Sequence, residues 1–298
     1  MENKIKNNYS IGVVTYVARY DKYFIPLIKQ LTSVFPDKEI ICTINGHPDT
    51  SLQIEYLKNV TAFLSQFSNI KYITYEKHQP IARCWNWLVL MSFSSAVLIL
   101  NDDIKVNLLF RKDFEKSFTE NQDFFIINNS WSHFLISKKI IKEIGWFEER
   151  LLGSGDEDGD YITRMAIKDM KVTNRLCGGI INYVAEQKNA GWKNISGVGH
   201  GKYSEINKEL MSKKWSPDYF KEKGAVLTKG METPIFYDFS CLDAKNIFPL
   251  IVNKYNQLNP KSYLKFLIPL NVIYSFFRKF GGNLYRFVKK KIKISSTN

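Results

Sequence analysis

Cysteine is scarce in this sequence, and several common phosphate-binding patterns are missing from it. The four cysteines among 298 residues are far apart and form no Cys-x-x-Cys pair, which argues against a disulfide framework and against a zinc site. No Gly-x-Gly-x-x-Gly follows the first expected strand, and no Gly-x-x-x-x-Gly-Lys-Ser/Thr occurs. A dinucleotide-binding Rossmann enzyme and a P-loop NTPase are therefore disfavoured. No serine lies in a nucleophile elbow, so no motif in the sequence indicates a hydrolase.

Acidic residues are absent from one end of the chain. Residues 261–298 contain nine Lys or Arg and no Asp or Glu, whereas the whole chain has a formal net charge of +13. The positive charge therefore lies mainly in this segment, which argues against a nucleic-acid groove across the body.

Long apolar runs are absent as well. The apolar stretch 266–277 has only twelve residues, whereas a transmembrane helix needs about 20. In residues 284–294 apolar side chains oppose cationic ones, which is typical of a helix on an anionic lipid surface. We expect 261–298 to form a basic amphipathic helical tail that associates with the membrane; the alternative is a surface helix packed on the body. The polar start predicts no signal peptide, and we expect a cytoplasmic protein, peripheral on the inner face of the cell membrane.

Apolar runs alternate with amphipathic segments through the first third of the chain. Buried strands are expected at 10–16, 39–44, 70–75 and 96–100, with helices at 21–35, 52–67 and 81–93 between them. This alternation predicts an α/β fold, a doubly wound and mostly parallel sheet with helices on both faces. We expect a catalytic domain at 1–220, an extension packed on it at 221–260, and the tail at 261–298.

Polar residues lie at the carboxyl ends of three of the expected strands. They are Thr15-Tyr16, Asn45 and Asn101-Asp102-Asp103. Ligands of such sheets bind beyond the carboxyl ends of the strands. Two adjacent carboxylates and an amide also supply hard oxygen ligands for Mg²⁺ or Mn²⁺. An ordinary Asn-Asp-Asp turn is the alternative.

A second acidic cluster lies in a glycine-rich loop. Asp156, Glu157, Asp158 and Asp160 are framed by Gly153, Gly155 and Gly159. Like charges this close raise one another's pKa unless a cation or a substrate lies among them. The pattern becomes helical from Asp158, so the carboxylates are expected at a helix start, where one could serve as a general base. A solvated helix cap is the alternative, and the spacing does not fit a calcium-binding loop.

The order of these motifs resembles one enzyme family. The run Val97–Ile104 is similar to the "DXD" motif of GT-A glycosyltransferases, especially the large inverting family 2. Ile144–Glu149 followed by Glu157-Asp158 is similar to their acceptor-side pattern, and Ala82–Asn86 is similar to the segment before the DXD strand. The resemblance covers residues 10–215.

The resemblance implies a nucleotide-sugar transferase assisted by Mn²⁺ or Mg²⁺. UDP-sugar is the favoured donor, and the acceptor would be a glycan or a lipid-linked saccharide in surface polysaccharide or lipo-oligosaccharide synthesis. Asp158 would deprotonate the acceptor hydroxyl, Glu157 would hold the acceptor, and Asp103 would coordinate the metal. The donor would be bound by Thr15, Tyr16, Asn45, Arg83, Asn101 and Asp102.

Two further residues each have two alternative roles, and two other functions are alternatives to the transferase. His200, in a glycine-rich loop, is either a metal ligand or structural, and Trp146 either packs in the core or stacks on an acceptor sugar. A sugar nucleotidyltransferase could share the fold, but its glycine-rich phosphate loop is missing after the first strand. A non-catalytic sugar- or lipid-binding module would not need Glu157-Asp158 on a glycine-framed loop.

Overall fold

The computed structural model describes residues 9–16, 19–46, 50–183, 203–215 and 225–239. The chain divides into two compact units, Met1–Val252 and Asn253–Asn298. All of the second unit lies outside the described residues, as do the expected tail at 261–298 and His200. The domain limits and the membrane association expected from the sequence stay predictions.

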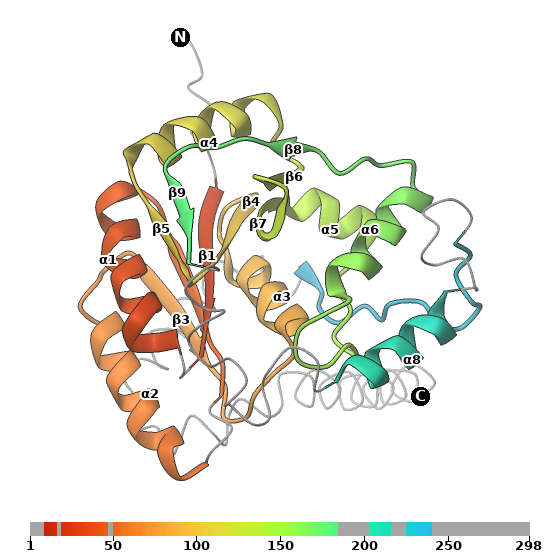
Figure 1. Cartoon of the computed structure of the whole chain (residues 1–298), viewed down its shortest axis with the longest axis horizontal. Helices are drawn as coiled ribbons and strands as arrows, with labels where there is room; N and C mark the ends of the chain where they lie inside the picture. The colour runs from red at the N-terminus through yellow and green to blue at the C-terminus, as the bar shows by residue number, and fades with distance from the viewer. Residues whose placement is uncertain (1–8, 17–18, 47–49, 184–202, 216–224, 240–298) are drawn as a thin grey trace, which may run out of the picture. The chain divides into compact units, whose positions relative to one another are not determined.

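A seven-stranded sheet forms the centre of the first unit, in the order β3-β2-β1-β4-β7-β6-β8 (Figure 1). The first four strands in this order are parallel, β7 runs antiparallel to β4, and β6 runs antiparallel to β7 and parallel to β8. The fold is therefore the mixed, mostly parallel α/β sheet that the alternation predicted. The strands are β1 (Tyr9–Thr15), β2 (Ile40–Ile44), β3 (Ile70–Thr74), β4 (Ala96–Asn101), β6 (Phe124–Ile127), β7 (Ser130–Ser137) and β8 (Asn174–Arg175).

Helices cover both faces of this sheet, because the side chains of each strand alternate between two cores. Ile11 and Val13 face a core shared with α1, α2 and α4, whereas Val97 and Ile99 face a core shared with α3, α5 and α6. The helices are α1 (Ile25–Val34), α2 (Thr50–Leu64), α3 (Ile81–Met91), α4 (Leu108–Glu120), α5 (Lys138–Ile144) and α6 (Glu157–Ile167).

The first helix differs from the expectation at its start. A π-helical turn, η2 (Tyr20–Phe24), precedes α1, and the N–H of Ile25 donates to the carbonyl of Tyr20. Pro26 lies at the second position of α1, and it has no N–H to donate to residue 22. The turn before α1 thus has the wider π spacing, and α1 begins where proline occupies its second position.

Three further elements complete the described part. A small sheet pairs β5 (Ile104–Val106) with β9 (Ile180–Asn182) in antiparallel fashion, and α8 (Ser204–Lys214) follows. Phe236, Tyr237 and Phe239 then pack against the core on the α3 face. Among the described helices, none combines the length and the apolar character that a membrane span would need.

Candidate active site

The parallel pairing of the strands brings the predicted donor residues to one edge of the sheet. Thr15 pairs with Ile44, and Val14 pairs with Asn101. The N–H of Asn45 donates to the carbonyl of Thr15 at 2.8 Å. Three residues that lie far apart in the sequence therefore meet at the carboxyl ends of β1, β2 and β4.

The two carboxylates after β4 are buried and share one partner. Thr15 Oγ1 donates to Asp102 Oδ2 at 2.7 Å. The two terminal nitrogens of Arg19 lie 2.8 Å from Asp102 Oδ1 and 2.6 Å from Asp103 Oδ2. We call Asp102 and Asp103 the acid pair. Sequence reasoning missed Arg19, because a single arginine in a loop gives no local signal of partners more than eighty residues away.

Burial dominates the electrostatics around the acid pair. It raises the pKa of Asp102 to about 6, helped by the charge of Asp103 and opposed by Arg19. Burial also raises the pKa of Tyr16 to about 12. His133, buried on β7, has its pKa lowered by burial to about 4, although the charge of Asp103 acts in the opposite direction. The imidazole is therefore neutral at neutral pH.

Asn45 and Arg83 belong to a chain of hydrogen bonds that leads away from the strand ends. Asn45 accepts from the N–H of Gln79 at 2.7 Å and donates to its carbonyl at 2.9 Å. Arg83, on α3, donates to the Gln79 side chain at 2.7 Å and to Glu149 Oε2 at 2.6 Å. The Arg83 side chain is 39% exposed, so it lies at the rim of this edge.

The glycine-framed loop lies against the start of α3. The N–H of Ile81 donates to the carbonyl of Gly153 at 2.8 Å. Gly153 has φ +66°, and a Cβ at this position would lie 2.7 Å from the ring of Tyr203. A residue without a side chain is therefore needed here for both reasons. Because Ile81 follows Gln79 by two residues, one short segment joins the glycine-framed loop to Asn45 at the carboxyl end of β2.

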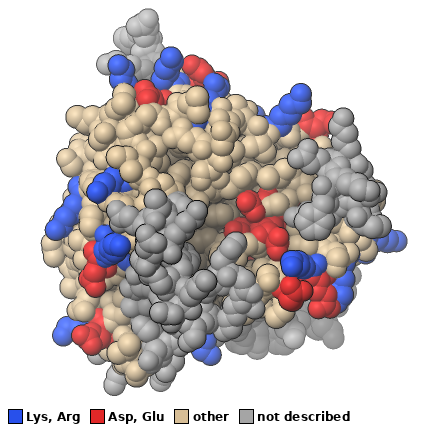
Figure 2. Space-filling view, viewed as in Figure 1, with Lys and Arg blue, Asp and Glu red and all other residues tan. Residues whose placement is uncertain are grey.

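Glu157 and Asp158 open α6, as the sequence predicted. They are its first two residues, and Asp160 lies in the same turn. In Figure 2, acidic side chains gather beside a hollow, near the place where Figure 1 draws the start of α6. Asp158 is half-buried, and its Oδ1 accepts from the N–H of Gly159 at 2.8 Å.

Glu157 is more deeply buried than Asp158. Its Oε2 accepts from the N–H of Gly155 at 2.5 Å. Burial raises the pKa of Glu157 to about 7, and the charge of Asp158 acts in the same direction, against the neighbouring N–H groups. Glu157 therefore differs in protonation from an ordinary glutamate near neutral pH.

This difference predicts a pH-dependent effect of Glu157→Gln on stability. The folded protein keeps the proton of Glu157 up to about pH 7, whereas the unfolded chain releases it near 4.5. The folded state therefore binds the extra proton between these values, and its stability falls as the pH rises through this window. The free energy of unfolding of the wild type, relative to Glu157→Gln, should drop by on the order of 1–3 kcal/mol between pH 5 and pH 8. Urea unfolding at several pH values measures it, with exposed Glu143→Gln as control, and a constant difference would contradict it.

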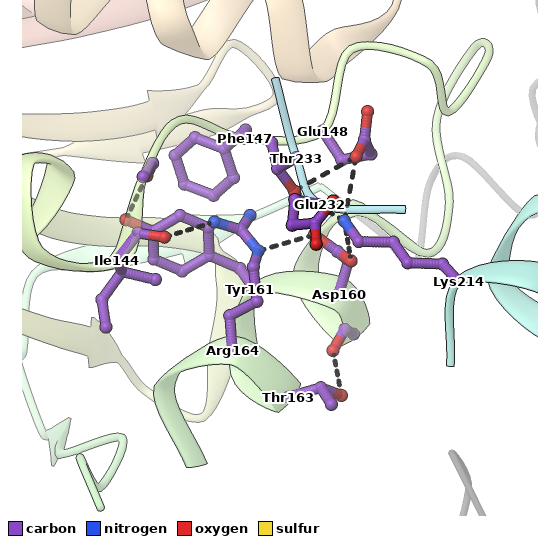
Figure 3. Close-up of polar contacts among 12 residues, drawn as sticks. Ile144, Phe147, Glu148, Asp160, Tyr161, Thr163, Arg164, Lys214, Glu232 and Thr233 are labelled. Carbon is purple, nitrogen blue, oxygen red and sulfur yellow. Dashed lines mark hydrogen bonds and ion pairs between the residues drawn. The ribbon is translucent and has the colours of Figure 1, made fainter. Parts of the chain in front are cut away.

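A buried lysine ties α6 to α8 and to residues 225–239 (Figure 3). Lys214 Nζ lies 2.6 Å from Asp160 Oδ1 and 2.9 Å from Glu148 Oε2, and it donates to Thr233 Oγ1 at 2.6 Å. Burial acts to raise the pKa of Glu148, but hydrogen bonds and charges of Arg150 and Lys214 hold it down at about 2. Glu148 is therefore ionised, and the network fixes the first turn of α6.

Trp146 and His200 are not placed at this edge by any described contact. The indole N–H of Trp146 donates to the carbonyl of Tyr237 at 2.8 Å, and its ring packs on Tyr237 and Phe239. This packing favours the core alternative for Trp146. His200 lies outside the described residues.

The acid pair has the chemistry that Mg²⁺ or Mn²⁺ requires. Its buried carboxylates are hard oxygen ligands, and Mg²⁺ beside a substrate phosphate is usually held by only one or two protein carboxylates. Within the described ranges, no group of three or more Asp, Glu, His or Cys side chains is arranged to hold a metal ion. Asp102 and Asp103 are therefore two candidate ligands for such a metal.

The fold and the site together are a mixed, mostly parallel α/β sheet with an acid pair at the carboxyl end of β4. Residues 57–196 match the family model described as "Glycosyltransferase like family 2". This segment contains the acid pair, the glycine-framed loop and α6. The match confirms the resemblance to family 2 glycosyltransferases over a little under half of the chain.

Solved structures of TarS from S. aureus are also similar to this chain. TarS 1–349 is 16% identical, with a TM-score of 0.41, over 57% of this chain and 57% of that chain. TarS 1–349 in complex with UDP-GlcNAc is 17% identical, with a TM-score of 0.41, over 57% of this chain and 55% of that chain. The matched part is thus less than two thirds of either chain. No curated protein sequence matches significantly.

Proposed function

We propose that the protein is an inverting glycosyltransferase that moves a sugar from a nucleotide-sugar donor, UDP-sugar favoured, to a glycan or lipid-linked saccharide. The observation that carries this proposal is the buried acid pair at the carboxyl end of β4, inside the segment that matches the family model. Ligands of parallel α/β sheets bind beyond such strand ends.

On the donor side, the chain's own residues would hold the nucleoside diphosphate. Thr15 orients the carboxylate of Asp102 by its hydrogen bond. The Asn45 side chain is fixed by two hydrogen bonds with Gln79 and by one from the N–H of Gly46. A divalent metal, when bound at Asp103, would neutralise the charge of the departing diphosphate. Arg83, at the rim, would add a positive charge near the same group.

On the acceptor side, Asp158 would take the proton of the attacking hydroxyl. The first turn of a helix favours an ionised carboxylate, and Asp158 lies there with one oxygen fixed by the N–H of Gly159. Glu157, next to it, would hold the acceptor sugar. A membrane-held acceptor in polysaccharide or lipo-oligosaccharide synthesis would fit the tail predicted at 261–298, which lies outside the described residues.

A binding experiment tests the donor side. Thermal unfolding should be measured with UDP-, GDP-, dTDP- and CMP-sugars, each with and without Mn²⁺. At 100 times its Kd, one of these donors should add about 2.7 kcal/mol to the free energy of unfolding. Addition of saccharide acceptors to that complex should then release the nucleoside diphosphate.

Two variants test whether the donor binds at the acid pair. Asp103→Asn should abolish the stabilisation, because it removes a charge from the acid pair. Asp123→Asn is the matched control: Asp123 pairs with Lys139 and accepts from Ser137, which lies opposite the first residue of β4, at the other end of the strand. Stabilisation by no nucleotide-sugar, or equal stabilisation of both variants, would count against the proposal.

A further inference from the structure

Arg19 is the side chain that neutralises the acid pair in this structure. It precedes η2, and its guanidinium lies within 2.8 Å of one carboxylate oxygen of Asp102 and 2.6 Å of one of Asp103. The side chain is 10% exposed, while the carboxylates are 0% and 4% exposed. A charge-assisted contact to both acids, held away from water, is stronger than an ion pair on the surface.

At least three of the four carboxylate oxygens of the acid pair therefore have a partner already. Arg19 contacts one oxygen of each acid, and Thr15 donates to the second oxygen of Asp102. A metal ion needs lone pairs of these same oxygens, and it would lie within a few ångströms of the guanidinium. Two cations this close in a buried place repel each other strongly. The guanidinium and a divalent cation are therefore alternative partners of the acid pair.

We propose that Arg19 is a built-in counter-cation that competes with a divalent metal for the carboxylates of Asp102 and Asp103. The free protein consequently binds divalent metal weakly. Metal binding becomes favourable when another anion draws the guanidinium away. The diphosphate of a sugar donor would be such an anion, because the guanidinium fork matches the geometry of phosphate as well as that of carboxylate. Only this last step rests on the proposed function.

The test is a titration with Mn²⁺ alone, without nucleotide, in which free Mn²⁺ is measured by electron paramagnetic resonance. Arg19→Gln removes the competing charge and keeps a hydrogen-bond donor. It should bind Mn²⁺ roughly tenfold more tightly than the wild type, or better. Arg19→Lys keeps the charge but cannot contact both acids through a planar fork, so it should show a smaller increase. It also keeps the test decisive if Arg19→Gln does not fold.

The chain offers a matched control for the arginine. Arg111 also contacts two acids, Asp37 at 2.8 Å and Glu115 at 3.0 Å. Glu115 accepts from Tyr9, the first residue of β1, whereas Thr15 is the last residue of that strand. Arg111→Gln is therefore at the opposite end of the sheet from the acid pair, and it should leave the Kd for Mn²⁺ unchanged.

A second substitution tests whether the Mn²⁺ gained by Arg19→Gln binds at the acid pair. Addition of Asp103→Asn to Arg19→Gln should remove the gain in Mn²⁺ affinity. Unchanged affinity in both Arg19 variants, an equal gain in Arg111→Gln, or a gain that survives Asp103→Asn would each overturn the proposal. Since no donor takes part, these outcomes do not depend on whether the protein transfers sugars.

Discussion

Lys214→Met should destabilise the protein by about 3–5 kcal/mol, as expected when one partner of a buried ion pair is removed. Lys214, Glu148 and Asp160 have fully buried side chains. The methionine would fill much of the same volume, so the loss would come mainly from two carboxylates left without their shared cation. Urea unfolding followed by circular dichroism measures this difference.

The neighbouring lysine provides the control. Lys213 is exposed and pairs only with Glu209 of the same helix among the described residues, and surface pairs of this kind contribute little. Lys213→Met should therefore leave the midpoint nearly unchanged. Equal effects of the two substitutions would show that the buried network does not hold α8 in place.

A double substitution separates the effect of the lost ion pair on stability from the effect of the changed packing. Asp160→Asn in the Lys214→Met background should restore part of the lost stability, because it removes one of the two negative charges that Lys214 no longer balances. Arg164 and Trp215 also donate to Asp160, and an asparagine oxygen can still accept from them. A double variant less stable than the sum of the single changes would contradict this interpretation.

The network has a consequence for the site, because Asp160 belongs to the same helical turn as Asp158. Lys214 comes from α8 and Thr233 from the segment after it, so two later parts of the chain fix the start of α6. Arg150 and Arg164 complete the balance of charge around Glu148 and Asp160. We infer that the acidic loop is held in one conformation by contacts outside the family-matched segment.

The sequence was sufficient for the first four strands of the large sheet, for the three helices between them and for the start of α6. Apolar runs of strand length and amphipathic segments of helix length are local patterns, and they predicted β1 to β4 and α1 to α3 within a few residues. The meeting of Thr15, Asn45 and Asn101 followed from parallel pairing alone. The start of α6 followed from the change to helical spacing after the glycines.

Pairs of charges distant in the sequence could not be predicted in this way. Arg19 and the acid pair are separated by more than eighty residues, and Lys214 and Glu148 by sixty-six. Lys214 lies beside a second lysine at the end of a polar helix, a pattern that normally indicates side chains exposed to solvent. Only tertiary packing makes it buried. Trp146 is a similar case, since the residues that pack against its ring, Tyr237 and Phe239, lie about ninety positions later in the sequence.

Asp158→Asn should lower kcat by about 10²–10⁴-fold, the usual contribution of a general base, while the donor still binds. The asparagine keeps the size and the hydrogen bond to Gly159, but it cannot accept a proton. Single-turnover transfer, together with thermal shifts by the donor, separates the chemical step from binding. A parallel loss of donor binding would indicate a structural effect instead.

Glu157→Gln is the decisive comparison, because Glu157 is the adjacent carboxyl group and has a pKa near neutrality. Burial and the hydrogen bond from Gly155 fix Glu157 against the loop, whereas Asp158 is only half-buried at the helix start. An acceptor hydroxyl can therefore reach Asp158 more easily. If Asp158 is the base, Glu157→Gln should raise the KM for the acceptor more than it lowers kcat. An active Asp158→Asn beside an inactive Glu157→Gln would instead assign the proton transfer to Glu157.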